Sequence, residues 1–146
     1  MHIFLLIAAA IFFRGLFDIF LSRGGGKIDS NISNIIVSIA ALLAASLPYM
    51  YFKVKNVTTI PTTLPGVVLS VCAGLTIGLA TLLIIKAYES GGLTYITPIV
   101  LGGSIAFATF AGTLVFQESA GFFQVLGIVV VLVGIGIIIY AKSYGI

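Results

Sequence analysis

The chain has 146 residues, of which 60% are hydrophobic and only 8% are charged. Soluble domains carry about 25% charged residues, so this chain lacks the polar side chains needed to cover a water-exposed surface. The same scarcity excludes a cytosolic enzyme, a nucleic-acid-binding protein and a disordered tail. We therefore expect a protein whose solvent is the lipid bilayer.

A helix needs about 20 predominantly apolar residues to cross the hydrocarbon core of a bilayer. Five stretches meet this requirement: residues 3–21, 32–52, 64–85, 93–116 and 120–141. The last four contain no charged residue, whereas the first contains Arg14 and Asp18. An arginine in mid-segment argues against a cleaved signal peptide. The sequence predicts an all-α polytopic membrane protein with five transmembrane helices in a single domain, residues 1–146.

Residues suited to catalysis or metal binding are scarce. The only cysteine, Cys72, lies in the third predicted span, and the only histidine, His2, has no partner at metal-ligand spacing. The chain contains no His-Glu-x-x-His motif, no nucleophile elbow and no phosphate-binding glycine loop. We therefore expect no enzymatic activity, no metal site and no cofactor.

Basic residues near the span ends give a weak indication of topology. One face of the membrane receives four of them and the other receives two: Arg23, Lys27, Lys86 and Lys142 against Lys53 and Lys55. The positive-inside rule would place the first face in the cytoplasm and the N-terminus outside. Because the bias is small, insertion in both orientations stays open.

The small size of the protein predicts an oligomer. Five helices form a thin wall around any transport pathway, and many secondary transporters consist of two repeats of opposite topology. We expect a homodimer, for which an antiparallel arrangement is one possibility.

The two charges in the first predicted span are the leading candidates for function. Arg14 and Asp18 are four residues apart and share one helix face. Arg14 lies roughly 12 Å from the polar end of the span at Ser22, and an ionised group at such depth in the membrane costs about 2.5–3.5 kcal/mol. Asp18 is one turn from that end and is expected near the headgroups. Arg14 either binds a carboxylate or phosphate of a substrate or forms a self-neutralising pair with Asp18.

The fourth predicted span opens with the segment Gly91-Gly-Leu-Thr-Tyr-Ile-Thr-Pro98. Proline is favoured at the first position of a helix, so the simpler prediction is that the helix starts at Pro98. The alternative is a polar break that exposes Thr94, Tyr95 and Thr97 to a pathway. Tyr95 and Thr97 are therefore candidate substrate-binding residues.

Three further features predict local structure. Asp29 precedes Ser30 and Asn31 and is expected to cap the second helix. Lys86 and Glu89 are three residues apart near the headgroups, a spacing that permits a local pair. Small residues recur at spacings that let helices pack closely: Gly74 and Gly78; Ser104, Ala108 and Gly112; Gly127 and Gly134.

The second half of the chain contains a series of short motifs: Lys86-Ala-Tyr, Pro98, Phe116-Gln-Glu118, Gln124-Val-Leu-Gly127 and Gly134. Together with the order of five spans, this series resembles the second half of an EamA-type repeat of the drug/metabolite transporter superfamily. The resemblance implies that the chain is a single five-span repeat, whereas members of the superfamily usually carry two such repeats. It also implies a structural role for Glu118 at the start of the last helix. Two positions depart from the family pattern: Gln117 replaces a glycine, and Arg14 replaces an aromatic residue.

The resemblance implies transport, and Arg14 favours an anion among the cargoes of that superfamily. The predicted function is therefore a secondary transporter of a small anionic metabolite, working by alternating access as a homodimer of half-transporters in a prokaryotic plasma membrane. The alternative is a non-transporting assembly or scaffold protein, which has no evident need for Arg14. A membrane-embedded transferase ranks lower because the four acidic residues are not clustered.

Overall fold

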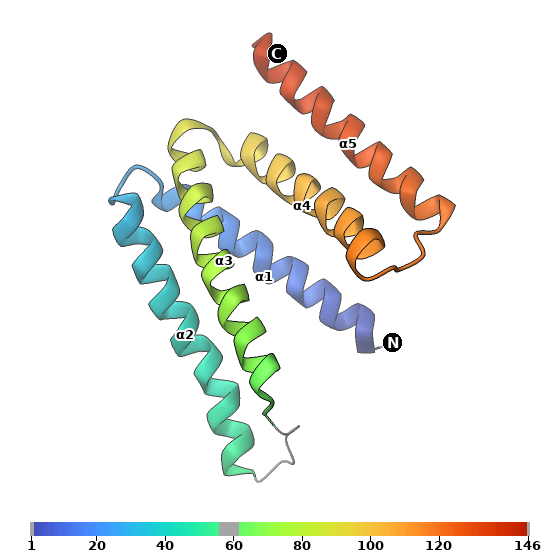
Figure 1. Ribbon diagram of the computed structural model, residues 1–146. Helices are drawn as coiled ribbons and strands as arrows, with labels where there is room; N and C mark the ends of the chain where they lie inside the picture. Colours follow the sequence, from blue (N-terminus) through green and yellow to red (C-terminus); the bar gives the residue numbers. More distant parts are fainter. Residues whose placement is uncertain (1, 56–61, 146) are drawn as a thin grey trace. The chain divides into compact units, whose positions relative to one another are not determined.

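The computed structural model describes residues 2–55 and 62–145, and these residues form five helices and no strand (Figure 1). The helices are α1 (His2–Gly24), α2 (Ser30–Val54), α3 (Leu64–Ser90), α4 (Leu93–Val115) and α5 (Phe122–Ser143). Each is long and apolar enough to cross a membrane. The predicted all-α fold with five membrane spans is confirmed.

Several helix ends differ from the predicted spans, some because the helix is longer and some because it is shorter. The third span was expected to end at Ile85, but α3 continues to Ser90, so Lys86 and Glu89 are helical. The fifth span was expected to begin at residue 120, but α5 begins at Phe122. Hydropathy locates the part of a helix that lies in lipid, whereas the hydrogen-bonded helix extends into the headgroup region.

The chain divides into two compact units. The first combines Met1–Asp18 with Gly91–Ile146, and the second is Ile19–Ser90. α1 therefore contributes its longer N-terminal part to the first unit and its last turns to the second. Whether the five helices behave as a single domain stays a prediction.

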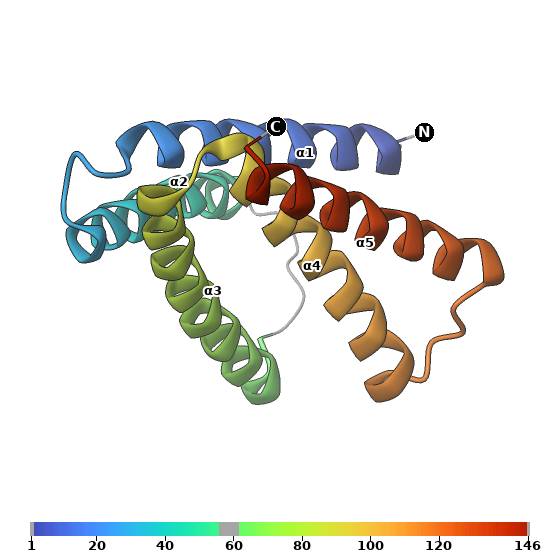
Figure 2. The same cartoon turned by 90° about the horizontal axis from the view of Figure 1, so that it is seen from above.

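In the first unit, α4 and α5 form a helical hairpin whose closest approach is at Gly102. A Cβ atom on Gly102 would lie 3.0 Å from Cγ1 of Val131 and would collide with Cδ1 of Ile135. The two helices separate from this point toward the connection at residues 116–121 (Figure 2). Only a glycine permits the contact, because any side chain there would push α5 away.

In the second unit, α2 and α3 pack side by side, and the core lies toward the end of α3. Ile85 is 1% exposed, and Thr81, Tyr88 and Leu21 are also buried. α2 starts as predicted: one carboxylate oxygen of Asp29 accepts hydrogen bonds from the amides of Asn31 (2.9 Å) and Ile32 (3.3 Å). Such a cap satisfies backbone donors that have no partner within the helix.

Most large apolar side chains are exposed, as expected for helices surrounded by lipid. Phe4 is 76% exposed and Phe123 is 83% exposed, values that would be unfavourable for so many side chains in water.

Four of the predicted small-residue packing sites lie on surfaces that no other helix of the described chain covers, and whether they pack against a second copy stays a prediction. Cβ atoms added to Gly74, Gly78, Gly127 or Gly134 would meet nothing within 4 Å in the described part of the chain. The close helix contact within the chain is at Gly102, which the spacing did not single out, because spacing along one helix does not reveal which face meets a neighbour.

Candidate functional site

The structure brings Arg14 and Asp18 together on α1. Nε of Arg14 lies 3.4 Å from Oδ2 of Asp18, the only ion pair among the described residues. This distance is long for a charge-assisted hydrogen bond, which is usually about 2.7–2.9 Å. The described bond uses Nε alone and does not involve the terminal Nη groups of the guanidinium.

Asp18 is buried among protein atoms, which the sequence did not indicate. Its residue is only 2% exposed, and its expected place near the headgroups stays a prediction. Its second carboxylate oxygen, Oδ1, is buried and has no hydrogen-bond partner in the described part of the chain. A buried acceptor without a donor costs about 1–3 kcal/mol, so Oδ1 is a place where a ligand or water donor would stabilise the protein.

Arg14 has a partly exposed side chain and an aromatic neighbour. Its side chain is 37% exposed, and Cζ lies 5.2 Å from the centre of the Phe17 ring on the next turn. A cation over a ring at this distance is attracted by the electrons of the ring face. Phe17 and Asp18 therefore hold the guanidinium on one side of α1, while the Arg14 side chain stays partly accessible.

Tyr95 and Thr97 lie in a continuous helix that matches the predicted span 93–116, so the expected helix start at Pro98 and the alternative polar break were both wrong. A role of Tyr95 and Thr97 in substrate binding stays a prediction. α4 begins at Leu93, and the carbonyl of Gly92 accepts the amides of Tyr95 (3.1 Å) and Ile96 (3.0 Å). Pro98 is inside the helix, where its missing amide leaves the Thr94 carbonyl without its usual partner. Starting at Leu93 gives a helix of about 34 Å, which spans the core more fully than one starting at Pro98.

The candidate site residues thus come from two helices of the first unit. Arg14 and Asp18 are in direct contact on α1, whereas Tyr95 and Thr97 lie partly buried in the first two turns of α4. Among the interactions described, only the first two residues are joined to each other.

A second polar cluster, in the Ile19–Ser90 unit, was missed by the sequence analysis. The hydroxyl of Ser30 donates a hydrogen bond of 2.5 Å to Oε1 of Glu89. Lys86 and Glu89 do not form the expected local pair in the described structure, because the carboxylate of Glu89 is directed to α2 instead. The two partners are 59 residues apart, and no spacing pattern would have found them.

Electrostatics in this cluster favour an ionised Asp29. The hydrogen bond from the Ile32 amide, followed by that from Asn31, lowers the pKa of Asp29 below its ordinary value of 3.8, and the nearby charge of Lys86 contributes a smaller effect in the same direction. Asp29 therefore acts as a negatively charged cap at the positive end of α2.

The connection between α4 and α5 places Glu118 differently from the prediction. Gln117 has φ 54°, a left-handed conformation, and the amide of Glu118 reaches the carbonyl of Gly112 at 3.2 Å. Oε2 of Glu118 lies 3.1 Å from the position that a Cβ on Gly112 would occupy. The carboxylate thus lies beside the end of α4, and it does not cap α5, whose N-cap residue is Gly121.

The described residues contain no group of three or more His, Cys, Asp or Glu side chains able to hold a metal ion. The side chain of His2 lies outside the described part of the chain.

These features define the chain as an all-α polytopic membrane protein with a charged pair inside its first span. No family model, curated protein or solved structure matches it.

Proposed function

We propose that this chain is a secondary transporter of the drug/metabolite transporter type, formed by a single EamA-like repeat, and that it moves a small anionic metabolite. One observation carries the proposal: Arg14 holds Asp18 through a single 3.4 Å contact from Nε while its side chain stays 37% exposed. A planar guanidinium whose Nη groups make no hydrogen bond to Asp18 suits a carboxylate or phosphate.

The depth of Arg14 supports a functional role. It follows His2 by 12 residues and precedes Gly24 by ten, so at 1.5 Å per residue it lies about 18 Å and 15 Å from the two ends of α1. Ionisable residues at such depth usually face a bundle interior or a water-filled cavity and mark a substrate or ion pathway.

Asp18 narrows the class of substrate. Its buried Oδ1 requires a hydrogen-bond donor, and an anion alone does not supply one. A substrate that carries an O–H or N–H group beside its anionic group would pair with Arg14 and Asp18 together. Hydroxy acids and amino acids have this combination.

A homodimer of half-transporters would form the complete transport pathway and would work by alternating access. The open surfaces at Gly74, Gly78, Gly127 and Gly134 leave room for the helices of a second copy. The near balance of basic residues on the two faces is compatible with an antiparallel pair in a prokaryotic plasma membrane.

A ligand-stabilisation screen of the purified protein tests this function. Carboxylates and phosphates are expected to raise the unfolding temperature, whereas neutral and cationic metabolites are not. Arg14→Gln should weaken anion binding at least about tenfold, because it removes a charge-assisted contact. Arg23→Gln is the matched control, since Arg23 is exposed at the end of the same helix.

Two further measurements separate the possible outcomes. Asp18→Asn should reduce the preference for hydroxylated over plain carboxylates while anions still bind, and uptake into proteoliposomes distinguishes transport from binding. A preference for cations, or equal affinity in the Arg14 and Arg23 variants, would contradict the proposal. A scaffold protein would show no response to any small molecule.

A further inference from the structure

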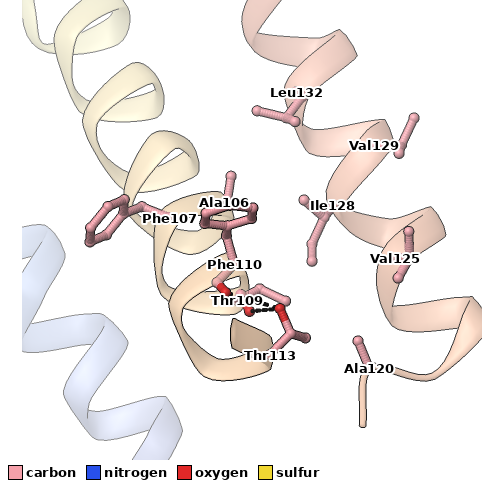
Figure 3. Close-up of a pocket in the computed structure, with 10 residues that line it drawn as sticks. All are labelled: Ala106, Phe107, Thr109, Phe110, Thr113, Ala120, Val125, Ile128, Val129 and Leu132. Carbon is pink, nitrogen blue, oxygen red and sulfur yellow. Dashed lines mark hydrogen bonds between the residues drawn. The ribbon is translucent and has the colours of Figure 1, made fainter. Parts of the chain in front are cut away.

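The α4–α5 hairpin contains an apolar pocket of about 480 Å³ (Figure 3). It begins at Ala106, one turn beyond the close contact at Gly102, and it extends to Ala120 in the connection between the helices. The pocket exists because Gly102 holds α4 and α5 together at one level while the connection at residues 116–121 keeps them apart at the other.

The lining of the pocket suits a hydrocarbon chain. Its only polar side chains are Thr109 and Thr113, and both hydroxyls donate to carbonyls of their own helix: Thr109 to Ile105 (3.0 Å), and Thr113 to Phe110 (2.9 Å) and Thr109 (3.2 Å). These donors are therefore already used. A polar metabolite would lose its hydration in this pocket without gaining new hydrogen-bond donors.

The pocket also has the position of a lipid tail. Along α5 it runs from Val125 to Leu132, about 10 Å at 1.5 Å per residue. One leaflet accounts for about 15 Å of a 30 Å hydrocarbon core, so the pocket lies within the leaflet next to the α4–α5 connection. The acyl chains of that leaflet are the apolar groups at this depth.

A single negative charge lies at the headgroup end of the pocket. Glu118 belongs to the connection, two residues before the pocket residue Ala120, and its carboxylate lies beside Gly112 at the end of α4. The other charged side chains described in this unit are Arg14 and Asp18 on α1 and Lys142 at the far end of α5. No described ion pair involves Glu118, so its charge is available to an external cation.

We propose that this pocket binds a phospholipid with a primary-ammonium headgroup, such as phosphatidylethanolamine. One acyl chain fills the space between α4 and α5, and the ammonium group contacts the carboxylate of Glu118. The ammonium contributes a positive charge and N–H donors to the contact, whereas an anionic headgroup such as that of phosphatidylglycerol is repelled.

The absence of tryptophan from the chain allows a direct test. Phe110→Trp places a single fluorophore in the pocket, and Ile7→Trp places one on lipid-exposed α1 at a matched depth, five residues from the helix end. Each variant is reconstituted in phosphatidylcholine vesicles. Phosphatidylethanolamine or phosphatidylglycerol with brominated acyl chains, which quench tryptophan on contact, is then titrated in.

The pocket tryptophan should reach half-maximal quenching at about threefold less phosphatidylethanolamine than phosphatidylglycerol, the range expected for one exposed ionic contact. The Ile7→Trp control should show equal curves for both lipids. Adding Glu118→Gln to Phe110→Trp should remove the preference, and Glu118→Asp, which keeps the charge, should retain most of it.

Three results would overturn the proposal. Equal curves for both lipids at the pocket tryptophan would show only bulk lipid contact. A preference for phosphatidylglycerol would contradict the role of Glu118. If every lipid quenches the pocket tryptophan only weakly, and if this quenching increases when the protein is diluted in the membrane, a second copy of the chain covers the pocket.

Discussion

The hydroxyl of Ser30, the first residue of α2, donates a hydrogen bond to the carboxylate of Glu89, the penultimate residue of α3. Ser30 is only 6% exposed, so the bond is partly shielded from solvent. It fixes the start of α2 against the end of α3, next to the capped turn at Asp29.

Removing this bond should lower stability by a measurable amount. Ser30→Ala and Glu89→Ala should each lower the unfolding temperature in detergent micelles, and a double-mutant cycle should give a coupling energy of about 1 kcal/mol. Ser38→Ala is the control, because the Ser38 hydroxyl bonds only a carbonyl of its own helix. A coupling energy near zero would show that the bond contributes nothing to stability.

The left-handed backbone at Gln117 makes a stabilising substitution possible. Gln117→Gly should raise the unfolding free energy by about 0.5–1 kcal/mol, because glycine adopts φ 54° without steric cost. Gln124→Gly inside α5 should have the opposite effect. Thermal unfolding of both variants checks the prediction, and a loss of stability in Gln117→Gly would contradict it.

Two adjacent glycines of α4 should respond differently to the same substitution. Gly102→Ala should be less stable than Gly103→Ala by about 1–3 kcal/mol, because a methyl group at residue 102 meets Val131 and Ile135 while one at residue 103 meets nothing within 4 Å. Comparing their unfolding midpoints tests the packing of α4 on α5. Equal midpoints would mean that the two helices do not approach at Gly102.

The cap at Asp29 should make stability depend on acid pH. The pKa of Asp29 is lowered in the folded protein, so its stabilising contribution is complete above the ordinary value of 3.8 and is lost as pH falls below that value toward the folded pKa. Unfolding temperatures measured from pH 6 to pH 3 should fall less steeply in Asp29→Ala than in the wild type. Parallel curves would contradict this assignment.

Local chemistry was sufficient for the features that depend on one short segment. The cap at Asp29 follows from a carboxylate placed just before a helix, and the five helices follow from the length of apolar sequence needed to cross a bilayer. The contact between Arg14 and Asp18 could be expected because their spacing puts them on one helix face. The availability of Arg14 for a substrate stays a prediction.

Features that join distant segments required the tertiary structure. The burial of Asp18, the bond from Ser30 to Glu89 and the contact at Gly102 depend on the surroundings that a residue acquires on folding. α4 likewise starts at Leu93 and not at Pro98, although proline favours the first position of a helix, because the longer helix spans the membrane more fully. The scarcity of charge determined the solvent of this protein and its five helices, whereas packing decided which of the few polar groups are buried and which meet.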